Sequence, residues 1–237
     1  MPQPHQDTAA SFLLQDLRAG TATLHVALEQ RLPFFSEQLD AAWYQRLIQA
    51  YYGFYQPLEA ALDQSGLIPA GYEPQLRRKT PALNGDLLAL GLSQAEIDHL
   101  PRCPQLPRLG TPGACLGTLY VLEGATLGGQ ILRREMARRL ALDAGNGGAF
   151  LDVYGALTGR RWKDFLDYLG RMPSHTSARQ QVVDAAQSTF ACFERWLDSR
   201  EVLLCPPRIP RPSSSCWPTA PTNPSVPRAR SSPMASC

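Results

Sequence analysis

The sequence predicts an all-α protein with a single helical domain, and two observations support this class. Apolar residues recur at spacings of three and four over four long segments, residues 10–31, 39–63, 114–141 and 177–200. That spacing is the period of an amphipathic helix. No run of alternating apolar and polar residues indicates a β-strand. We therefore expect seven or eight helices.

The helix over residues 10–31 carries an apolar stripe that includes Leu17, Thr21, Leu24 and Leu28. Asp7 or Thr8 can cap its start, and Pro33 ends it because proline cannot continue the hydrogen-bond ladder. The helix over residues 39–63 carries a largely aromatic stripe, and Pro57 should kink it. We interpret this stripe as core packing, with the wall of a ligand pocket as the alternative.

The middle of the chain predicts shorter elements. Residues 64–81 form a loop, and a short helix over residues 82–90 ends at Gly91. A second short helix over residues 93–100 opens with a capping-box pattern. Residues 101–113 hold four prolines and form a connection.

The helix over residues 114–141 has four internal glycines, Gly117, Gly124, Gly128 and Gly129. Each glycine costs about 1 kcal/mol relative to alanine in a helix interior, so something must need the space. A close helix–helix crossing is one explanation. A flat ligand that approaches the bare backbone is the other. After a turn at 145–148, residues 149–172 predict one or two further helices before the last one.

The two ends of the chain differ from the helical domain at residues 10–203. Residues 1–9 predict a flexible N-terminus. Residues 204–237 predict a disordered tail, because they hold nine of the 21 prolines, seven serines, four arginines and no acidic residue. The whole chain has two lysines against 21 arginines, as GC-rich coding DNA produces. We hypothesise that the tail is a frame-shifted or otherwise non-native extension.

Composition excludes several classes of protein. No apolar run approaches the roughly 18 residues that cross a bilayer, and the N-terminus lacks a signal-peptide pattern. We therefore expect a cytoplasmic protein without a membrane partner. Three cysteines in residues 1–203, without a C-x-x-C pair, argue against disulfides and zinc. The slightly acidic domain argues against a nucleic-acid partner.

His25 is the only one of the four histidines inside a long helix beside an apolar stripe. Glu29 follows at i+4 on the same face and can accept a hydrogen bond from one ring nitrogen while the other faces a metal. Arg18 lies two turns earlier on that face and could meet an anionic group. A half-buried structural histidine with surface charges is the alternative. Together with the glycine helix, this pattern indicates a haem pocket.

Three stretches resemble the bacterial, biliverdin-producing haem oxygenases of the bacteriophytochrome-associated type. They run from Leu17 to Glu29, from Tyr51 to Glu59 and from Tyr120 to Ile131, and the last is the most specific. The resemblance covers most of residues 10–200. It implies the haem oxygenase fold, a helical bundle.

The resemblance also implies roles for single residues. His25 is the expected axial iron ligand, with Glu29 on its free ring nitrogen. Gly124, Gly128 and Gly129 are the expected catalytic residues, on the distal helix over the haem. Tyr120, earlier on the same helix, is expected to bind haem. Arg18 and Lys163 match basic positions that pair with haem propionates. One position departs from the family: many members carry an aspartate where this chain has Ala125, and Glu123 points about 160° away from it.

The implied activity is cleavage of haem, both cofactor and substrate, by O2 to biliverdin, carbon monoxide and ferrous iron. No nucleotide-binding motif is present, so we expect electrons from an external reductase or ferredoxin. A bilin-binding photoreceptor is a further candidate partner. Two alternatives stay open: a non-catalytic protein that stores or senses haem, and a helical scaffold without cofactor.

Overall fold

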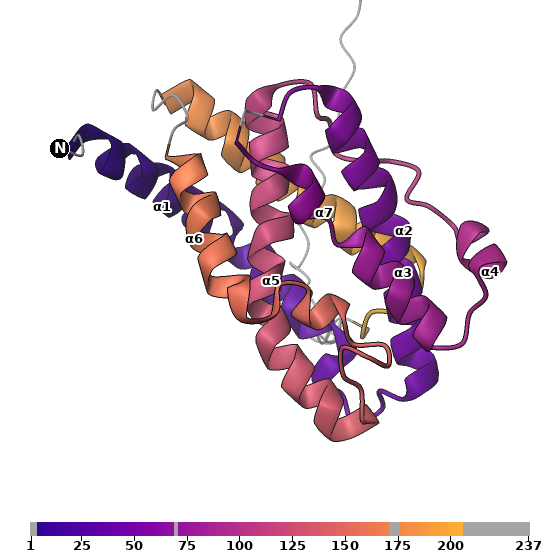
Figure 1. Cartoon of the computed structure of the whole chain (residues 1–237). Helices are drawn as coiled ribbons and strands as arrows, with labels where there is room; N and C mark the ends of the chain where they lie inside the picture. Colours follow the sequence, from indigo (N-terminus) through magenta and orange to yellow (C-terminus); the bar gives the residue numbers. More distant parts are fainter. Residues whose placement is uncertain (1–3, 69–70, 171–175, 206–237) are drawn as a thin grey trace, which may run out of the picture. The chain divides into compact units, whose positions relative to one another are not determined.

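The computed structural model describes residues 4–68, 71–170 and 176–205, and this part of the chain is helical without any strand (Figure 1). Its seven α-helices agree with the predicted number. The predicted tail lies outside the described residues from Pro206 on. The compact unit ends at Cys205, two residues beyond the predicted domain end.

The first long helix, α1, spans Pro4–Arg31 and begins earlier than predicted. Residues 4–9, predicted as part of a flexible start, are helical, so α1 begins six residues before the predicted start at residue 10. Proline is compatible with the first turn of a helix, where its missing N–H has no partner to lose. Helix α1 ends at Arg31, just before the predicted stop at Pro33. A short 3₁₀-helix over Pro33–Phe35 follows.

The second long helix, α2, spans Ala41–Ser65 and continues through Pro57. The Asp40 carboxylate caps its start by accepting a hydrogen bond of 2.7 Å from the Trp43 N–H. Gly66 ends it in the left-handed region at φ 62°. Its aromatic stripe is buried, which confirms the core-packing interpretation.

The short helices α3, Thr80–Ala89, and α4, Gln94–Asp98, follow. The predicted capping box is confirmed, because Ser93 and Glu96 bond reciprocally at the start of α4. Helix α3 begins two residues before the predicted start at residue 82. A carboxylate from α2, Glu59, caps it by accepting hydrogen bonds from the N–H groups of Lys79 and Thr80 at 2.7 and 3.2 Å. This cap comes from another helix, so no local pattern could predict it.

The glycine-bearing helix α5 spans Pro112–Leu140, and Thr111 caps it. Two 3₁₀-helices, Phe150–Asp152 and Gly155–Leu157, precede α6 at Thr158–Leu169. These three elements replace the one or two helices expected over residues 149–172. The last helix, α7, spans Thr176–Ser199.

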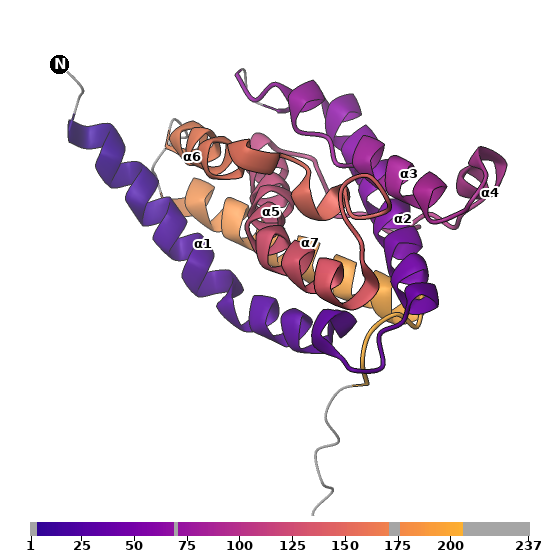
Figure 2. The same cartoon turned by 60° about the horizontal axis from the view of Figure 1, so that its bottom comes forward.

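Helices α5 and α7 pack closely against each other, and α1 lies along α7 (Figure 1, Figure 2). At Gly117 an added β-carbon would lie 2.1 Å from the Val182 carbonyl oxygen. A side chain there would therefore push α7 away from α5. The close-crossing explanation thus holds for Gly117.

The end of the described chain returns to α1 and α2. The Leu204 N–H donates to the Arg31 carbonyl at 2.7 Å, and the Trp43 indole donates to the Val202 carbonyl at 3.0 Å. The Arg31 guanidinium also bonds Glu194 of α7 at 2.8 Å. These contacts anchor the segment after α7 and close the helical domain.

Candidate active site

A cavity of about 590 Å³ lies between α1 and α5, with further walls from α2, α7 and the 3₁₀-helix Phe150–Asp152. Ligand pockets for small molecules and cofactors typically measure about 300–1,000 Å³. Its wall is mostly apolar and aromatic, and four of these aromatic residues are Tyr51, Tyr55, Phe190 and Phe193. The aromatic stripe of α2 therefore packs in the core and also lines a pocket, so both interpretations of it apply.

His25 lines this cavity from α1, and Glu29 stands beside it one turn later. The ring atom Nδ1 lies 3.2 Å from Glu29 Oε2, as the i, i+4 spacing predicted. Phe190 meets the imidazole edge to face, with the ring centroids 5.8 Å apart. The side chain of His25 is 53% exposed, so it is open to a ligand that enters the cavity. With Nδ1 held by Glu29, Nε2 is the nitrogen left for a metal.

Arg18 and Tyr120 meet the cavity from its two main walls, α1 and α5. Burial raises the pKa of Tyr120, while a hydrogen bond with Thr21 and the charge of Arg18 act in the opposite direction. Helices α1 and α5 therefore come close together at the end of the cavity where Arg18 and Tyr120 lie. A guanidinium here can pair with a carboxylate of a bound ligand.

The glycines of α5 divide into two kinds. At Gly128 an added β-carbon would meet no atom within 4 Å, and at Gly124 it would meet only Trp162 at 4.0 Å. At Gly129 it would lie 2.5 Å from the Leu151 carbonyl oxygen. All three line the cavity. Gly124 and Gly128 leave space beside the cavity, whereas Gly129 lets Leu151 approach the helix.

Lys163 is the predicted site residue that the structure does not bring together with the others. It is exposed on α6, and the described residues that line the cavity include its neighbour Trp162 instead. The role of Lys163 toward a propionate stays a prediction.

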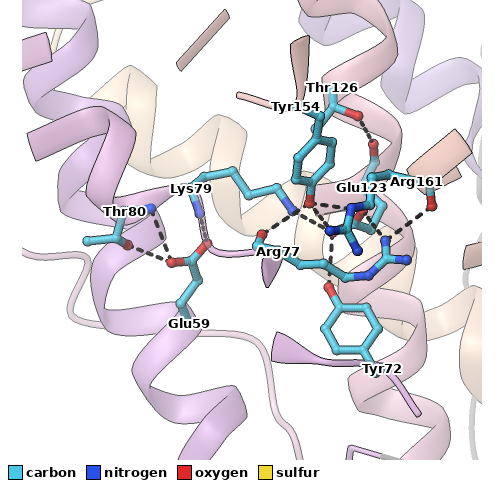
Figure 3. Close-up of polar contacts among 9 residues, drawn as sticks. All are labelled: Glu59, Tyr72, Arg77, Lys79, Thr80, Glu123, Thr126, Tyr154 and Arg161. Atoms are coloured by element: carbon cyan, nitrogen blue, oxygen red, sulfur yellow. Dashed lines mark hydrogen bonds and ion pairs between the residues drawn. The ribbon is translucent and has the colours of Figure 1, made fainter. Parts of the chain in front are cut away.

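A buried polar cluster behind the α5 wall was missed by the sequence interpretation (Figure 3). Glu123, which is 1% exposed, accepts hydrogen bonds from Tyr72 and Tyr154 at 3.0 Å and from Arg77 at 2.8 Å. The ammonium of Lys79 also bonds this carboxylate. The one available signal was the acidic residue directly before Gly124, but its partners come from elements far away in the sequence.

Burial shifts the pKa of three groups in this cluster. It raises the pKa of Tyr72 and of Tyr154, and the negative charge of Glu123 acts in the same direction. Burial lowers the pKa of Lys79, while the attraction of Glu123 opposes that shift. Lys79 is also a wall residue of the large cavity, so the cluster borders the site.

Asp86 of α3 positions part of the cavity wall. Its carboxylate accepts hydrogen bonds from the N–H groups of Ala149 and Phe150 at 2.7 and 2.8 Å. Phe150 lines the cavity, where it meets Tyr51 and Tyr55 edge to face. Because Asp86 is 1% exposed, this anchor is shielded from water.

The residues present fit a haem. The apolar aromatic walls suit a porphyrin, the single imidazole with a carboxylate partner suits axial ligation of iron, and Arg18 suits a propionate. The space beside Gly124 and Gly128 accommodates a flat ring near the helix backbone. A side chain at either position would project into that space.

An all-helical fold with an apolar, aromatic cavity and one histidine in its wall defines a candidate haem-binding helical protein. The family model described as "Heme oxygenase" matches residues 11–199, which is most of the chain. The chain therefore belongs to the haem oxygenase family and is a haem-degrading monooxygenase.

Proteins that are similar to this chain in sequence or in fold include bacterial haem oxygenases. A haem oxygenase of Xanthomonas campestris pv. campestris (strain 8004) is 28% identical over 162 residues, which cover 67% of this chain and 91% of the relative. The haem oxygenase structure from Leptospira interrogans has a TM-score of 0.66 at 22% identity, covering 79% of this chain and 98% of its own. Haem oxygenase-2 from Synechocystis, in complex with haem and NO, has a TM-score of 0.64 at 21% identity, covering 80% and 85%. The resemblance seen in the sequence is confirmed at the level of family and fold.

Within the described residues, no helix is long and apolar enough to cross a membrane.

Proposed function

We propose that this protein binds haem in the cavity between α1 and α5 and cleaves it to biliverdin, carbon monoxide and ferrous iron. The observation that carries the proposal is the His25–Glu29 pair on one wall, together with the open space beside Gly124 and Gly128 on another. The haem complex of the Synechocystis relative supports haem as the ligand. Bound haem would supply the redox and oxygen chemistry, as cofactors do in such enzymes.

Each side chain has a binding or orienting role. His25 would ligate iron through Nε2, and Glu29 would accept the Nδ1 proton and so hold the ring in one tautomer and orientation. Arg18 would pair with one propionate, and Lys163 is the predicted partner of the other. Tyr120 of α5, which is half-buried, would pack against the ligand.

The glycines would act through the space that they leave. Gly124 and Gly128 admit the ring edge close to the α5 backbone, and Gly129 keeps that part of α5 against Leu151. The aromatic side chains around them exclude water from the apolar part of the cavity. The chain would thereby hold one edge of the porphyrin in a fixed place.

Electrons would come from a separate reductase or ferredoxin, and a bilin-binding photoreceptor is a candidate recipient of the product. A cytoplasmic location would suit both partners. The absence of a nucleotide-binding motif in the sequence supports the separate donor.

Haem titration followed by turnover tests the proposal. Wild type should develop a Soret band on titration, and adding ascorbate or a reductase should replace this band by biliverdin absorbance. His25→Ala should bind haem with an altered spectrum and lose turnover, since no imidazole then ligates the iron. His99→Ala is a matched control, because His99 is exposed at the end of α4 and does not line the cavity.

The same experiment tests the alternative of a protein that stores or senses haem. Ala125 favours that alternative, because it leaves the α5 wall without the aspartate of many relatives. A stable Soret band under reductant would support storage and contradict our proposal. Identical spectra of wild type and His25→Ala would contradict His25 as the ligand.

A further inference from the structure

Trp162 is the one residue of α6 that lines the cavity, within the part of the chain that the structure describes. Helix α6 packs against both α1 and α5, the two main walls (Figure 1). The side chain of Trp162 is half-buried and meets the cavity from this third helix. Neither the iron ligation nor the charge pairing proposed above uses it.

The indole of Trp162 bounds the open space beside Gly124. Its atoms Cη2 and Cζ3 lie 4.0 Å from the place that a β-carbon on Gly124 would occupy, and no other described atom outside α5 lies within 4 Å of that place. Carbon atoms in contact are about 3.5–4.0 Å apart, so a flat ring does not fit between the indole and the Gly124 backbone. A ligand ring beside Gly124 therefore stops at the indole.

Neighbouring aromatic rings hold this indole in place. The ring centroid of Trp162 lies 6.0 Å from that of Tyr120 and 5.8 Å from that of Phe165. Phe165 is fully buried and in turn meets Tyr72 edge to face at 6.2 Å. Aromatic rings attract each other at such separations, so the indole has little freedom to move. It is a fixed boundary of the cavity.

This boundary stands at the end of the cavity where Arg18 lies. The charge of Arg18 acts on Tyr120, the ring that the indole contacts. A guanidinium can hold a propionate carboxylate, but the propionate chain turns about single bonds. Such a pair tolerates several in-plane angles of the porphyrin. A rigid aromatic boundary, in contrast, acts on the ring itself.

We propose that Trp162 is a specificity-determining residue that limits the in-plane rotation of bound haem and so selects the meso edge that is cleaved. This inference rests on the proposed function, in which His25 ligates the iron and one ring edge lies beside Gly124 and Gly128. With the iron held by His25, rotation about the iron–imidazole axis is the freedom that the ring keeps within its plane. The indole stops this rotation on the side of α6.

Proton NMR of the ferric haem–cyanide complex tests the proposal without turnover. The shifts of the porphyrin methyl groups in such a complex depend on the angle between the ring and the plane of the axial imidazole. Trp162→Ala should shift the wild-type methyl resonances or add a further set, because the ring gains new orientations. Trp162→Leu keeps an apolar side chain against Phe165 and serves if Trp162→Ala fails to fold.

The product reports the same change. Turnover with ascorbate, followed by chromatography, separates the biliverdin isomers that wild type and variant form. We expect the ratio of the main isomer to the others to fall roughly tenfold in Trp162→Ala, as the loss of one good aromatic contact would cause.

Trp43→Ala is the matched control. Trp43 is a half-buried tryptophan of α2 that does not line the cavity, and its indole donates to the Val202 carbonyl. Its substitution removes the same atoms, yet the methyl resonances and the isomer ratio should match wild type. The same change in both variants would show a general loosening of the domain and overturn the proposal.

Unchanged methyl resonances or an unchanged isomer ratio in a folded, haem-loaded Trp162→Ala or Trp162→Leu protein would also overturn it. Failure of wild type to bind haem or to form biliverdin would instead contradict the proposed function itself, so the two failures are distinguishable.

Discussion

The carbonyl oxygen of Leu151 lies where a β-carbon on Gly129 would come within 2.5 Å of it. Gly128, the preceding residue on the same helix, has no such neighbour within 4 Å. Two adjacent glycines therefore serve different purposes. Gly129 allows a 3₁₀-helix to pack on α5, and Gly128 leaves space beside the cavity.

Alanine substitution should separate these purposes. Gly129→Ala should lower the free energy of unfolding by about 1–3 kcal/mol, because the backbone of Leu151 must move. Gly128→Ala should raise it by up to about 1 kcal/mol through helix propensity. Urea unfolding of the apo-proteins measures both changes. Equal destabilisation by the two substitutions would contradict this division.

The haem spectrum should change more in Gly128→Ala than in Gly129→Ala, the reverse of the order expected for stability. Gly128→Ala places a methyl group in the open space beside the cavity, so we expect weaker haem binding and a shifted Soret band in a fully folded protein. Haem titration of Gly128→Ala and wild type, with circular dichroism to confirm folding, measures the effect. An unchanged affinity would show that the ligand does not approach this part of α5.

Glu29 should control the strength of the iron–imidazole bond. Glu29→Gln keeps the size of the side chain but removes the charge that favours a polarised Nδ1–H. We expect haem to bind still, with a ferrous iron–histidine stretching frequency below that of wild type, measured by resonance Raman spectroscopy. The control is Glu37→Gln, an exposed carboxylate that lies outside the cavity wall. The same frequency in Glu29→Gln and wild type would exclude the proposed hydrogen bond.

Alkaline pH should unfold the domain through its buried tyrosines. Burial raises the pKa of Tyr44, Tyr51, Tyr55, Tyr72 and Tyr154 above the ordinary value of 10.0. Below pH 10 both states keep these protons, so the stability is fully present. Above it the unfolded chain ionises first, and each tyrosine removes up to about 1.4 kcal/mol per pH unit.

Ultraviolet absorbance of tyrosinate and circular dichroism, followed together, measure this transition. We expect most of the tyrosinate signal to appear with the loss of helix. Ionisation of these tyrosines near pH 10 in a protein that keeps its helical signal would contradict their burial.

The segment after α7 should contribute to the stability of the domain as far as Leu204. A chain that ends at Cys205 keeps the Leu204–Arg31 hydrogen bond, whereas one that ends at Val202 loses it. We expect the shorter chain to be less stable by about 1 kcal/mol, the usual value of one hydrogen bond, and the longer one to keep its haem spectrum. Denaturant unfolding compares the two truncations. Equal stability would show that this anchor contributes nothing.

Several features of the site were predictable because they depend on neighbours along one helix. The His25–Glu29 contact follows from i, i+4 geometry, and the Ser93–Glu96 capping box follows from a local pattern. The helix over residues 39–63 was predictable from its apolar period, which matches the observed α2 within two residues at each end. Helix periodicity is a property of the chain itself, so it can be read without knowing what packs against the helix.

The sequence by itself determined the helical class, the family and seven of the residues that line the cavity, among them His25 and Glu29. Only the tertiary structure decided which glycines serve packing and which leave space, since that depends on Leu151 and on α7. It also decided that Lys79 and Glu123, 44 positions apart, form one buried pair, and that Lys163 lies outside the cavity wall. Such contacts join elements that are distant in sequence, and the packing of whole helices, rather than any local pattern, sets the distances between them.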